Sequence, residues 1–423
     1  MKKSIIVYEA FARAYPGKTG KKFHSLEKDL ERLKTLGVNA VWLMPIHPTG
    51  SVGRKGALGS PYAIKDYYEI DPILGTKEDF KNLVQRAHEL NMRIIMDMVL
   101  NHTALDSVLF QEHPEWFLRD ERGNFLRKVP EWSDVIDLDY TKPELREYMI
   151  RMMEYWVREF DVDGFRCDVA GLVPLDFWVQ ARKRLNTIKE LIWISETHDP
   201  YMYKAFDVTY DYDGYYKFRD YLAGRCTLKD YVDFLKFQDK IYPVGYVKMR
   251  FLENHDQVRI AKLLPEEKLR HWVVFLFTVK GIPLIHNGQE YGLKEEVDLF
   301  NHYELPIADL QTENQIYSLH KKMGFYRSKM DLFKEGEMIF LSNSTPNSVI
   351  TYLWRLGNKF ALCVLNPELH EGEVEVDFAG IFENVSIHAK DIVSDDLVRL
   401  SVKNSKTRFV AGREPMVLSF VLY

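Results

Sequence analysis

The 423-residue chain has few cysteines, no long apolar run and no cluster of basic residues. Its three cysteines, Cys167, Cys226 and Cys363, lie far apart without a CxxC pair, so neither a disulfide framework nor a zinc knuckle is expected. The longest dense apolar run, residues 272–279, stops at Lys280 and is shorter than the roughly 18 residues of a membrane span. We therefore expect no disulfide scaffold, no structural zinc and no membrane partner.

The charge distribution excludes a further class of partner. The formal net charge is −5 and the sequence pI is 6.3, and because lysine and arginine are not gathered in runs, nucleic acid is not an expected partner. Near the N-terminus, Glu9 interrupts the apolar run Ser4–Tyr8 before the apolar region of a signal peptide would be complete. We therefore expect a cytoplasmic protein.

Short β-like runs alternate with amphipathic helical stretches over the first three quarters of the chain, a pattern that predicts parallel strands with crossover helices. Ser25 is the expected cap of a first helix, and Thr76 with Asp79 forms an expected capping box. Eight strands make a complete (β/α)8 barrel. They are expected at residues 5–11, 38–45, 93–99, 162–166, 191–195, 205–210, 247–252 and 282–285.

Two segments depart from this alternation. Residues 101–140 contain Pro114, Gly123 and Pro130 and are too long for an ordinary βα loop, which indicates a small inserted domain after the third strand. After about residue 335 the sequence pattern changes to short apolar runs separated by turn residues, which is typical of an antiparallel β-sandwich. The expected fold is thus α/β, with a TIM barrel at residues 1–100 and 141–335, an inserted domain at 101–140 and a C-terminal β-sandwich at 336–423.

Most of the expected barrel strands end in polar or ionisable side chains. In a βα barrel these ends line one face, the face that carries the active site. Converging carboxylates push their pKa values apart, as an acid and a nucleophile require. For one pair alone, such as Arg166 with Asp168, a structural ion pair at a strand end is an equal alternative. The residues in question are Asp97, Asn101, His102, Arg166, Asp168, Glu196, His255 and Asp256.

Four of these strand ends carry a resemblance to a known family. Residues 97–102 (DMVLNH), 164–170 (GFRCDVA), 194–196 (ISE) and 251–256 (FLENHD) resemble, in the same order, the four motifs of the α-amylase family, glycoside hydrolase family 13. Supporting segments are residues 41–46, 60–62, 281–283 and 288–292, and the resemblance extends from Val7 to the C-terminus.

The resemblance implies roles for three carboxylates. Asp168 would be the nucleophile, Glu196 the general acid/base, and Asp256 the carboxylate that holds the distorted sugar. Arg166, two residues before Asp168, is expected to favour the ionised form of the nucleophile. This division of work is that of a retaining glycosidase.

The same resemblance implies roles around the carboxylates. His102 and His255 would bind sugar hydroxyls, although isolated histidines are more often structural. Tyr62 would stack on a sugar ring, with core packing as the alternative. Asp97 and Asn101 are expected to support the site without taking part in bond chemistry.

Departures from the family pattern bear on the subfamily and on metal binding. Residues 169–172 (VAGL) replace the Ala-Lys-His of secreted calcium-dependent amylases and resemble the neopullulanase, cyclomaltodextrinase and maltogenic amylase branch, while His286 stands where tyrosine is commoner. No cofactor is expected, and Ca²⁺, for which Asn101 and Asp137 could supply oxygen atoms, is not expected to be essential. Because the first strand starts at about Ser4, we expect a monomer, or a dimer that does not form through an N-terminal domain.

The expected function is retaining hydrolysis of α-1,4-glucosidic bonds in maltooligosaccharides, starch or cyclodextrins, with transglycosylation left open. An exo-acting α-glucosidase is the alternative enzyme. A third hypothesis, a non-catalytic carbohydrate-binding or transporter-associated family member, is disfavoured because Asp168, Glu196 and Asp256 are all present. The sequence leaves endo or exo action open, because it depends on the loops that close the cleft.

Overall fold

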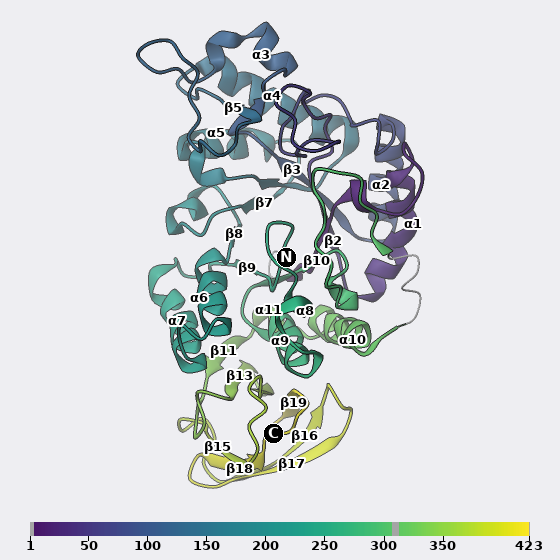
Figure 1. The fold of residues 1–423 in the computed structure, drawn as a ribbon. Coiled ribbons are helices and arrows are strands. Elements are labelled where there is room, and N and C mark those ends of the chain that lie inside the picture. The colour runs from purple at the N-terminus through teal and green to yellow at the C-terminus, as the bar shows by residue number, and fades with distance from the viewer. Residues whose placement is uncertain (1–3, 307–312, 423) are drawn as a thin grey trace.

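The computed structural model of the chain describes residues 4–306 and 313–422 (Figure 1). Eight parallel strands close into a barrel in the order β1-β10-β9-β8-β7-β6-β3-β2, in which neighbours follow one another along the chain. The C-terminal part forms separate antiparallel sheets, drawn in yellow below the barrel in Figure 1. The predicted α/β barrel is therefore confirmed.

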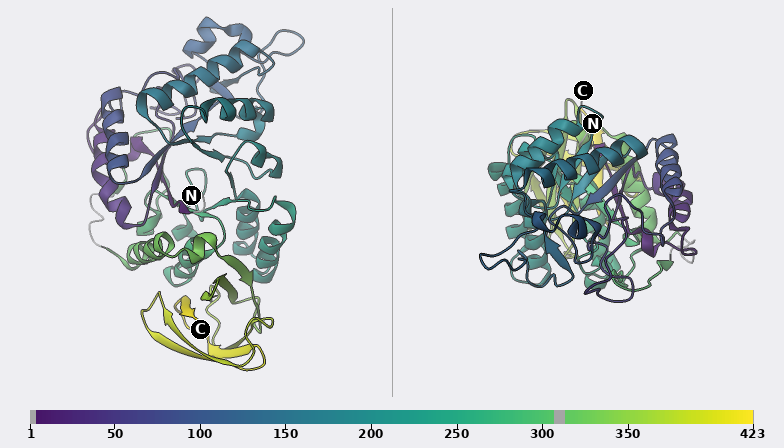
Figure 2. Two further views of the ribbon diagram at one scale, coloured as in Figure 1. Left: turned by 180° about the vertical axis from the view of Figure 1, so that it is seen from behind. Right: turned by 90° about the horizontal axis from the view of Figure 1, so that it is seen from above.

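The barrel strands are short and buried on both faces, because helices cover the outside of the barrel (Figure 2). Most are shorter than the apolar run that predicted them, since the flanking apolar residues pack in loops at the two ends of the barrel. The strands are β1 (Val7–Ala10), β2 (Ala40–Leu43), β3 (Arg93–Met98), β6 (Gly164–Cys167), β7 (Ile192–Ser195), β8 (Val208–Tyr210), β9 (Lys248–Arg250) and β10 (Ile282–His286).

Of the two helix-capping predictions, the one for Thr76 and Asp79 is confirmed and the one for Ser25 is wrong. Thr76 and Asp79 form the predicted capping box, in which the Thr76 hydroxyl accepts from the Asp79 amide and the Asp79 carboxylate accepts from the Thr76 amide. The prediction for Ser25 was wrong, because the first helix already begins at Lys22 and buries Phe23 against the barrel. Packing of an apolar face decides the start of this helix more strongly than the capping residue does.

Long helices connect the strands, and shorter helical turns lie in the loops. The longer ones are α1 (Lys22–Thr35), α2 (Lys77–Glu89), α4 (Pro143–Phe160), α5 (Leu175–Leu185), α6 (Tyr212–Leu222), α7 (Leu228–Ile241), α9 (Glu266–Thr278) and α10 (Gln315–Lys329). The short ones are α3 (Val108–Glu112), α8 (Ile260–Leu263), α11 (Leu332–Glu335), η2 (Ala12–Ala14), η3 (Pro114–Trp116), η4 (Ala170–Leu172), η5 (Pro200–Lys204) and η6 (Gln289–Tyr291). No helix within residues 4–306 and 313–422 has the length and apolar character of a membrane span.

The segment between β3 and α4 has a small sheet of its own. Strand β4 (His102–Ala104) pairs antiparallel with β5 (Val135–Asp137), and His102 lies opposite Asp137. This pairing folds the intervening chain back over the carboxyl ends of the barrel strands. The pairing also brings the His102 and Trp132 rings into contact, with their centroids 5.3 Å apart.

The C-terminal segment forms two antiparallel sheets, as predicted for this part of the chain. The first contains β11 (Glu337–Phe340), β13 (Ile350–Leu356), β14 (Lys359–Leu365), β19 (Met416–Val421), β16 (Val385–Asp391) and β17 (Leu397–Val402). The second contains β12 (Ser342–Asn343), β15 (Glu373–Asp377) and β18 (Lys406–Val410).

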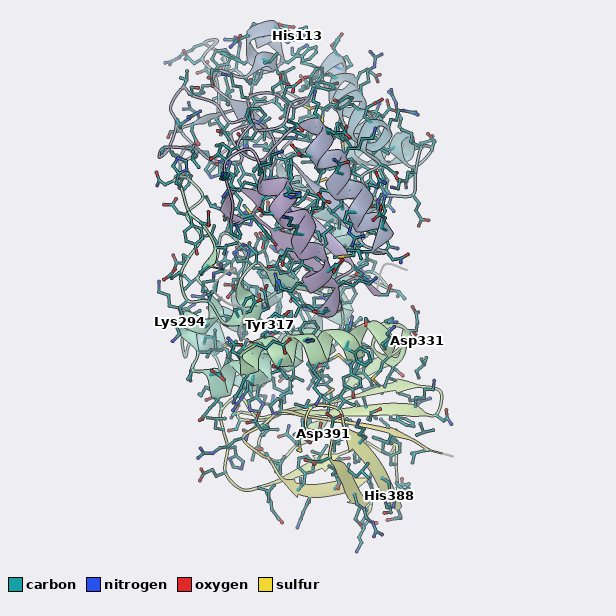
Figure 3. All side chains as sticks on the ribbon, turned by 90° about the vertical axis from the view of Figure 1, so that its right-hand side faces the viewer. His113, Lys294, Tyr317, Asp331, His388 and Asp391 are labelled. Carbon is teal, nitrogen blue, oxygen red and sulfur yellow. The ribbon has the colours of Figure 1, made fainter. Side chains whose placement is uncertain are left out.

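Strand β13 packs on both sides, which ties the larger sheet to the barrel. Tyr352 and Trp354 belong to the apolar core of the barrel, whereas Leu353 belongs to the core between the two C-terminal sheets. The Trp354 indole N–H donates to the Thr278 carbonyl oxygen at 2.7 Å, at the end of α9. Helix α10 lies in the same layer between barrel and sheets, with Tyr317 near one end and Asp331 just beyond the other (Figure 3).

We predict that Trp354→Ala lowers the free energy of unfolding by about 3–5 kcal/mol, because it removes a buried indole from the contact between sheet and barrel. The matched control is Leu397→Ala on β17 of the same sheet, where the side chain is 88% exposed and its loss should change little. Urea unfolding followed by circular dichroism measures both. Equal transitions for the two variants would contradict this account of the contact.

Candidate active site

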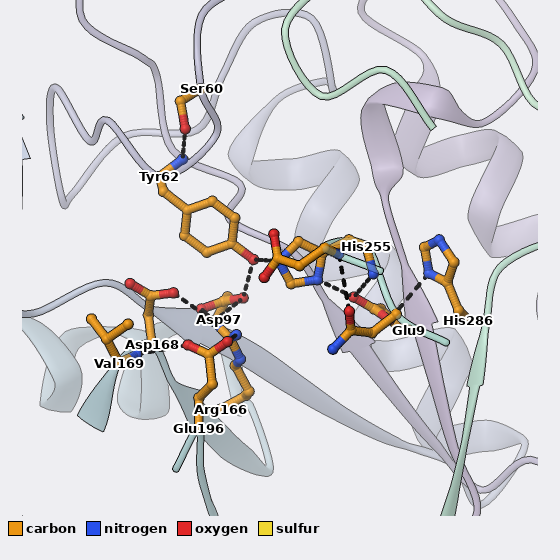
Figure 4. A network of polar contacts seen from close by, with 12 residues as sticks. Glu9, Ser60, Tyr62, Asp97, Arg166, Asp168, Val169, Glu196, His255 and His286 are labelled. Carbon is orange, nitrogen blue, oxygen red and sulfur yellow. Dashed lines mark hydrogen bonds and ion pairs between the residues drawn. The ribbon is translucent and has the colours of Figure 1, made fainter. Parts of the chain in front are cut away.

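The predicted site residues meet at the carboxyl ends of the barrel strands, and Figure 4 shows Tyr62, Asp97, Arg166, Asp168, Glu196 and His255 among them. A cavity of about 270 Å³ opens there, and its lining includes Tyr62, His102, Asp168, Glu196, His255 and Asp256. Arg166 forms an ion pair with Asp168, Asp97 accepts a hydrogen bond from the Tyr62 hydroxyl, and Asn101 is fully buried beside His102. The structure therefore brings together all the residues that the strand-end pattern and the family resemblance identified.

The Arg166 guanidinium lies at the centre of the site and is fully buried. Its Nη1 is 2.9 Å from Asp97 Oδ1 and 2.9 Å from Asp168 Oδ1, and its Nη2 is 2.6 Å from Glu196 Oε1. The remaining nitrogen, Nε, donates to the Tyr210 hydroxyl at 3.1 Å. One cation thus holds three carboxylates, which arrive from the ends of β3, β6 and β7.

This crowding changes the protonation of the carboxylates. Burial and the neighbouring Glu196 raise the pKa of Asp168 well above its usual value, and Arg166 offsets this only in part. Burial likewise raises the pKa of Asp97 to about 6 against the opposing effect of Arg166. Arg166 contacts Asp168 as expected from the sequence. Its effect on the pKa is nevertheless outweighed, because one positive charge cannot balance three buried negative charges.

Glu196 is fixed by two further hydrogen bonds. Its Oε2 accepts from the Val169 amide at 2.7 Å, and its Oε1 accepts from the Tyr212 hydroxyl at 2.9 Å. Val169 has a φ of 34°, a left-handed conformation that a β-branched residue adopts only under strain. The strained turn directly after Asp168 therefore aims an amide at Glu196 and holds the two carboxylates side by side.

Tyr62 and His255 form the opposite side of the cavity. Their rings are stacked, with centroids 5.4 Å apart and planes at 20°. The Tyr62 hydroxyl lies 2.8 Å from His255 Nε2 and donates to Asp97 Oδ2 at 3.3 Å. Tyr62 is partly buried and borders the cavity, so one part of its ring packs while another faces the space for a ligand.

His102 and Asp256 differ in their access to solvent. His102 is buried, and burial lowers its pKa to about 4, so its ring is neutral at pH 7. Its Nδ1 lies 3.1 Å from the side-chain nitrogen of Asn101. The Asp256 side chain is 48% exposed at the rim, with its Oδ2 3.3 Å from His255 Nε2. Asp256 is therefore the most accessible of the predicted site carboxylates.

The residues of the site that were not predicted from the sequence include Tyr212, Glu9 and Trp132. Tyr212 lies two residues beyond the end of β8, so the strand-end criterion could have found it. Glu9 carried a signal as well, because a charged residue inside an apolar strand needs a buried partner. Trp132 lies in the irregular segment between β3 and α4, where no strand or helix periodicity marks it as a site residue.

The oxygen atoms considered for Ca²⁺ are already in use. Asn101 Oδ1 accepts from the Lys128 ammonium at 2.7 Å, and the same ammonium donates to the Leu172 carbonyl oxygen at 2.8 Å. Asp137 Oδ2 accepts from the Lys128 amide at 2.8 Å. Within residues 4–306 and 313–422 no group of three or more histidine, cysteine, aspartate or glutamate side chains is arranged to hold a metal ion. This arrangement of residues does not fit a calcium ion at Asn101.

A closed parallel barrel with adjacent carboxylates at its strand ends is the arrangement of a barrel glycoside hydrolase. The family model for the alpha amylase catalytic domain matches residues 6–134 and 109–331, and the model for the alpha-amylase-like C-terminal domain matches residues 336–423. The chain belongs to the α-amylase family of glycoside hydrolases.

Known relatives agree with this family. The crystal structure of a maltogenic alpha-amylase from Thermotoga neapolitana is 67% identical, with a TM-score of 0.97, and the match covers 100% of this chain and 99% of that one. Alpha-amylase 2 of Dictyoglomus thermophilum is 28% identical over 83% of this chain, which spans 65% of that relative's length. An intracellular maltogenic amylase of Bacillus subtilis is 26% identical over 80% of this chain and 60% of its own length.

Proposed function

We propose that this chain is a retaining hydrolase of α-1,4-glucosidic bonds in maltooligosaccharides, starch or cyclodextrins, with the action of a maltogenic amylase. The observation that carries the proposal is the placement of Asp168 and Glu196 on the two terminal nitrogens of one guanidinium. The similarity to the maltogenic alpha-amylase of Thermotoga neapolitana, over almost the whole of both chains, supports the substrate class.

In this proposal Asp168 attacks the anomeric carbon while Glu196 gives a proton to the departing glycosidic oxygen. The covalent glycosyl-enzyme then reacts with a water molecule, which gives its proton to the Glu196 carboxylate. Asp256 at the rim holds the distorted sugar, and Arg166 positions both reacting carboxylates. With a sugar acceptor in place of water, the same intermediate would give transglycosylation.

The surrounding residues bind and orient the sugar. Tyr62 offers a ring for stacking, and His102 and His255 offer ring nitrogens for hydroxyl groups at the cavity wall. Asp97, buried behind them, supports Arg166 and Tyr62. The α-glucosidase hypothesis and the hypothesis of a non-catalytic family member find less support, because the carboxylate set is complete and the similar proteins described above are amylases.

Two further points concern the location of the protein in the cell and its oligomeric state. We propose a cytoplasmic location, for which the similarity to the intracellular maltogenic amylase of Bacillus subtilis is the support. The expectation of a monomer, or of a dimer that does not use an N-terminal domain, stays a prediction. Sedimentation of the purified chain would test it.

We predict retention of the α-anomer. A retaining glycosidase places its two carboxyl groups about 5 Å apart, which leaves no room for an intervening water molecule. Proton NMR of the first product from maltotriose measures the anomer directly. Initial release of the β-anomer would refute the assignment of Asp168 as nucleophile.

We predict that Glu196→Gln and Asp168→Asn differ by substrate. Without its acid, Glu196→Gln should lose roughly 10² to 10⁴ in rate on maltooligosaccharides, yet still form the glycosyl-enzyme from α-maltosyl fluoride, whose leaving group needs no proton. Asp168→Asn, which lacks the nucleophile, should fail on both substrates.

Fluoride release and sugar chromatography measure the two reactions, and circular dichroism establishes that each variant is folded. If both folded variants lost the same factor on both substrates, the division of roles between Glu196 and Asp168 would be wrong.

We propose that calcium is dispensable, because the Lys128 ammonium takes the position that a cation would need at Asn101. EDTA should leave both the activity and the melting temperature of the wild type unchanged. Lys128→Met should lower the free energy of unfolding by about 1–3 kcal/mol, because the buried Asn101 oxygen loses its donor. Lys142→Met, at an exposed ion pair 3.8 Å from Asp139, is the control and should have little effect.

A further inference from the structure

We propose that Glu9, from the first barrel strand, is a positioning residue that keeps His255 as an imidazolium and thereby fixes the direction of the hydrogen bonds at the floor of the active site. The inference rests on the proposed function, since it assigns His255 to sugar binding. Glu9 itself touches no reacting atom and acts only through His255.

Glu9 is a fully buried carboxylate that faces two histidine rings. Its Oε1 lies 2.5 Å from His255 Nδ1, and its Oε2 lies 3.1 Å from His286 Nδ1 (Figure 4). Burial opposes ionisation, but the two imidazoles outweigh it and lower the pKa of Glu9 below its usual value. An ionised carboxylate in this position requires a positive partner.

The groups that face His255 come from several elements. On one side are Glu9 of β1 and the edge of the Trp42 ring of β2, 5.8 Å between centroids. On the other are Asp256, next in the chain, and the Tyr62 hydroxyl, with Asp97 and Arg166 behind it. Burial and Arg166 disfavour a charge on the ring, but Asp256 and Glu9 prevail and raise the pKa of His255 to about 9.

The charge of His255 decides how the hydrogen bonds run. In the imidazolium, Nδ1–H donates to Glu9 and Nε2–H donates to the Tyr62 oxygen, so the Tyr62 hydroxyl proton is free to reach Asp97 Oδ2. In a neutral ring with its proton on Nδ1, Nε2 is an acceptor. His255 and Asp97 would then compete for the single Tyr62 proton, and one contact would be lost.

This ordering matters for sugar binding, because both His255 and Tyr62 line the cavity. As an imidazolium, His255 gives its Nε2–H to the Tyr62 oxygen, and Asp256 Oδ2 at the rim lies 3.3 Å from the same nitrogen. A sugar hydroxyl in the site would therefore meet a Tyr62 hydroxyl held in one orientation, with its proton directed at Asp97. Glu9, in strand β1, exerts this control through the opposite ring nitrogen, Nδ1.

The test is the pH dependence of the affinity for maltotriose, measured by calorimetry in Glu196→Gln with and without Glu9→Gln, because the acid Glu196 then adds no alkaline limb of its own. The binding-competent form of His255 is protonated, so with Glu9 present the affinity should fall as the pH rises through about 9. Without the carboxylate the pKa of His255 should fall toward the ordinary value near 6.5, and the alkaline limb should move to lower pH by at least about one unit. An alkaline limb that does not move would overturn the proposal.

The matched control is Glu290→Gln. Glu290 is also a fully buried carboxylate, and it contacts the Tyr8 hydroxyl at 2.9 Å and Arg32 at 2.8 Å, outside the active site. Both variants should lose stability, which is all that a purely structural role of Glu9 requires. Only Glu9→Gln should shift the alkaline limb.

A second measurement needs neither activity nor a folded Glu9 variant. Nitrogen NMR of histidine-labelled wild-type protein at pH 8 should show the His255 ring protonated on both nitrogens, with the signal identified by its loss in His255→Gln. A neutral His255 at pH 8 would overturn the proposal. If the chain hydrolysed no α-glucan while His255 was an imidazolium, the proposed function would fail and the role of Glu9 would stand.

Discussion

The site depends on one buried cation, the Arg166 guanidinium. Taking a charge out of water costs several kcal/mol unless partners replace the lost solvation, and here three carboxylates do so. The Trp42 and Tyr210 rings flank the guanidinium, with centroids 4.8 and 5.5 Å from its carbon. The pairing of β3 with β6 sets Asp97 directly opposite Arg166, so a slip of one residue would turn these side chains to opposite faces of the barrel wall.

The imbalance of charge around Arg166 is what suits the site to acid and base chemistry. Burial, together with repulsion from the neighbouring carboxylates, makes Asp168 and Asp97 hold a proton more tightly than an isolated carboxylate does, which raises the pKa of each. A retaining mechanism needs one protonated and one ionised carboxyl group in the same place. In the proposed roles Glu196 carries the proton and Asp168 is the ionised group. Both lie on one shared cation, and the strained residue Val169 donates its amide to Glu196.

The sequence predicted the parts of the site that are determined locally. Asp97, Arg166, Glu196 and Asp256 stand at or just beyond strand ends, and the barrel geometry alone brings such positions together. Contacts made across the closed barrel could not be predicted, because they depend on how distant elements pack. Glu9 meets His255 across 246 residues of sequence, and the pKa of Asp168 follows from burial that no local pattern reveals.

These contacts join into one chain of alternating charge across the barrel. It runs from the Glu9 carboxylate through His255 and the Tyr62 hydroxyl to Asp97, and from there to Arg166 and its other carboxylates. Each charge is compensated by its neighbours in surroundings where water cannot replace a lost partner. Members of such a network do not contribute independently. His255 and the carboxylates on Arg166 are therefore connected through Tyr62 and Asp97, so the effects of substitutions at the two ends of the network are not expected to add independently.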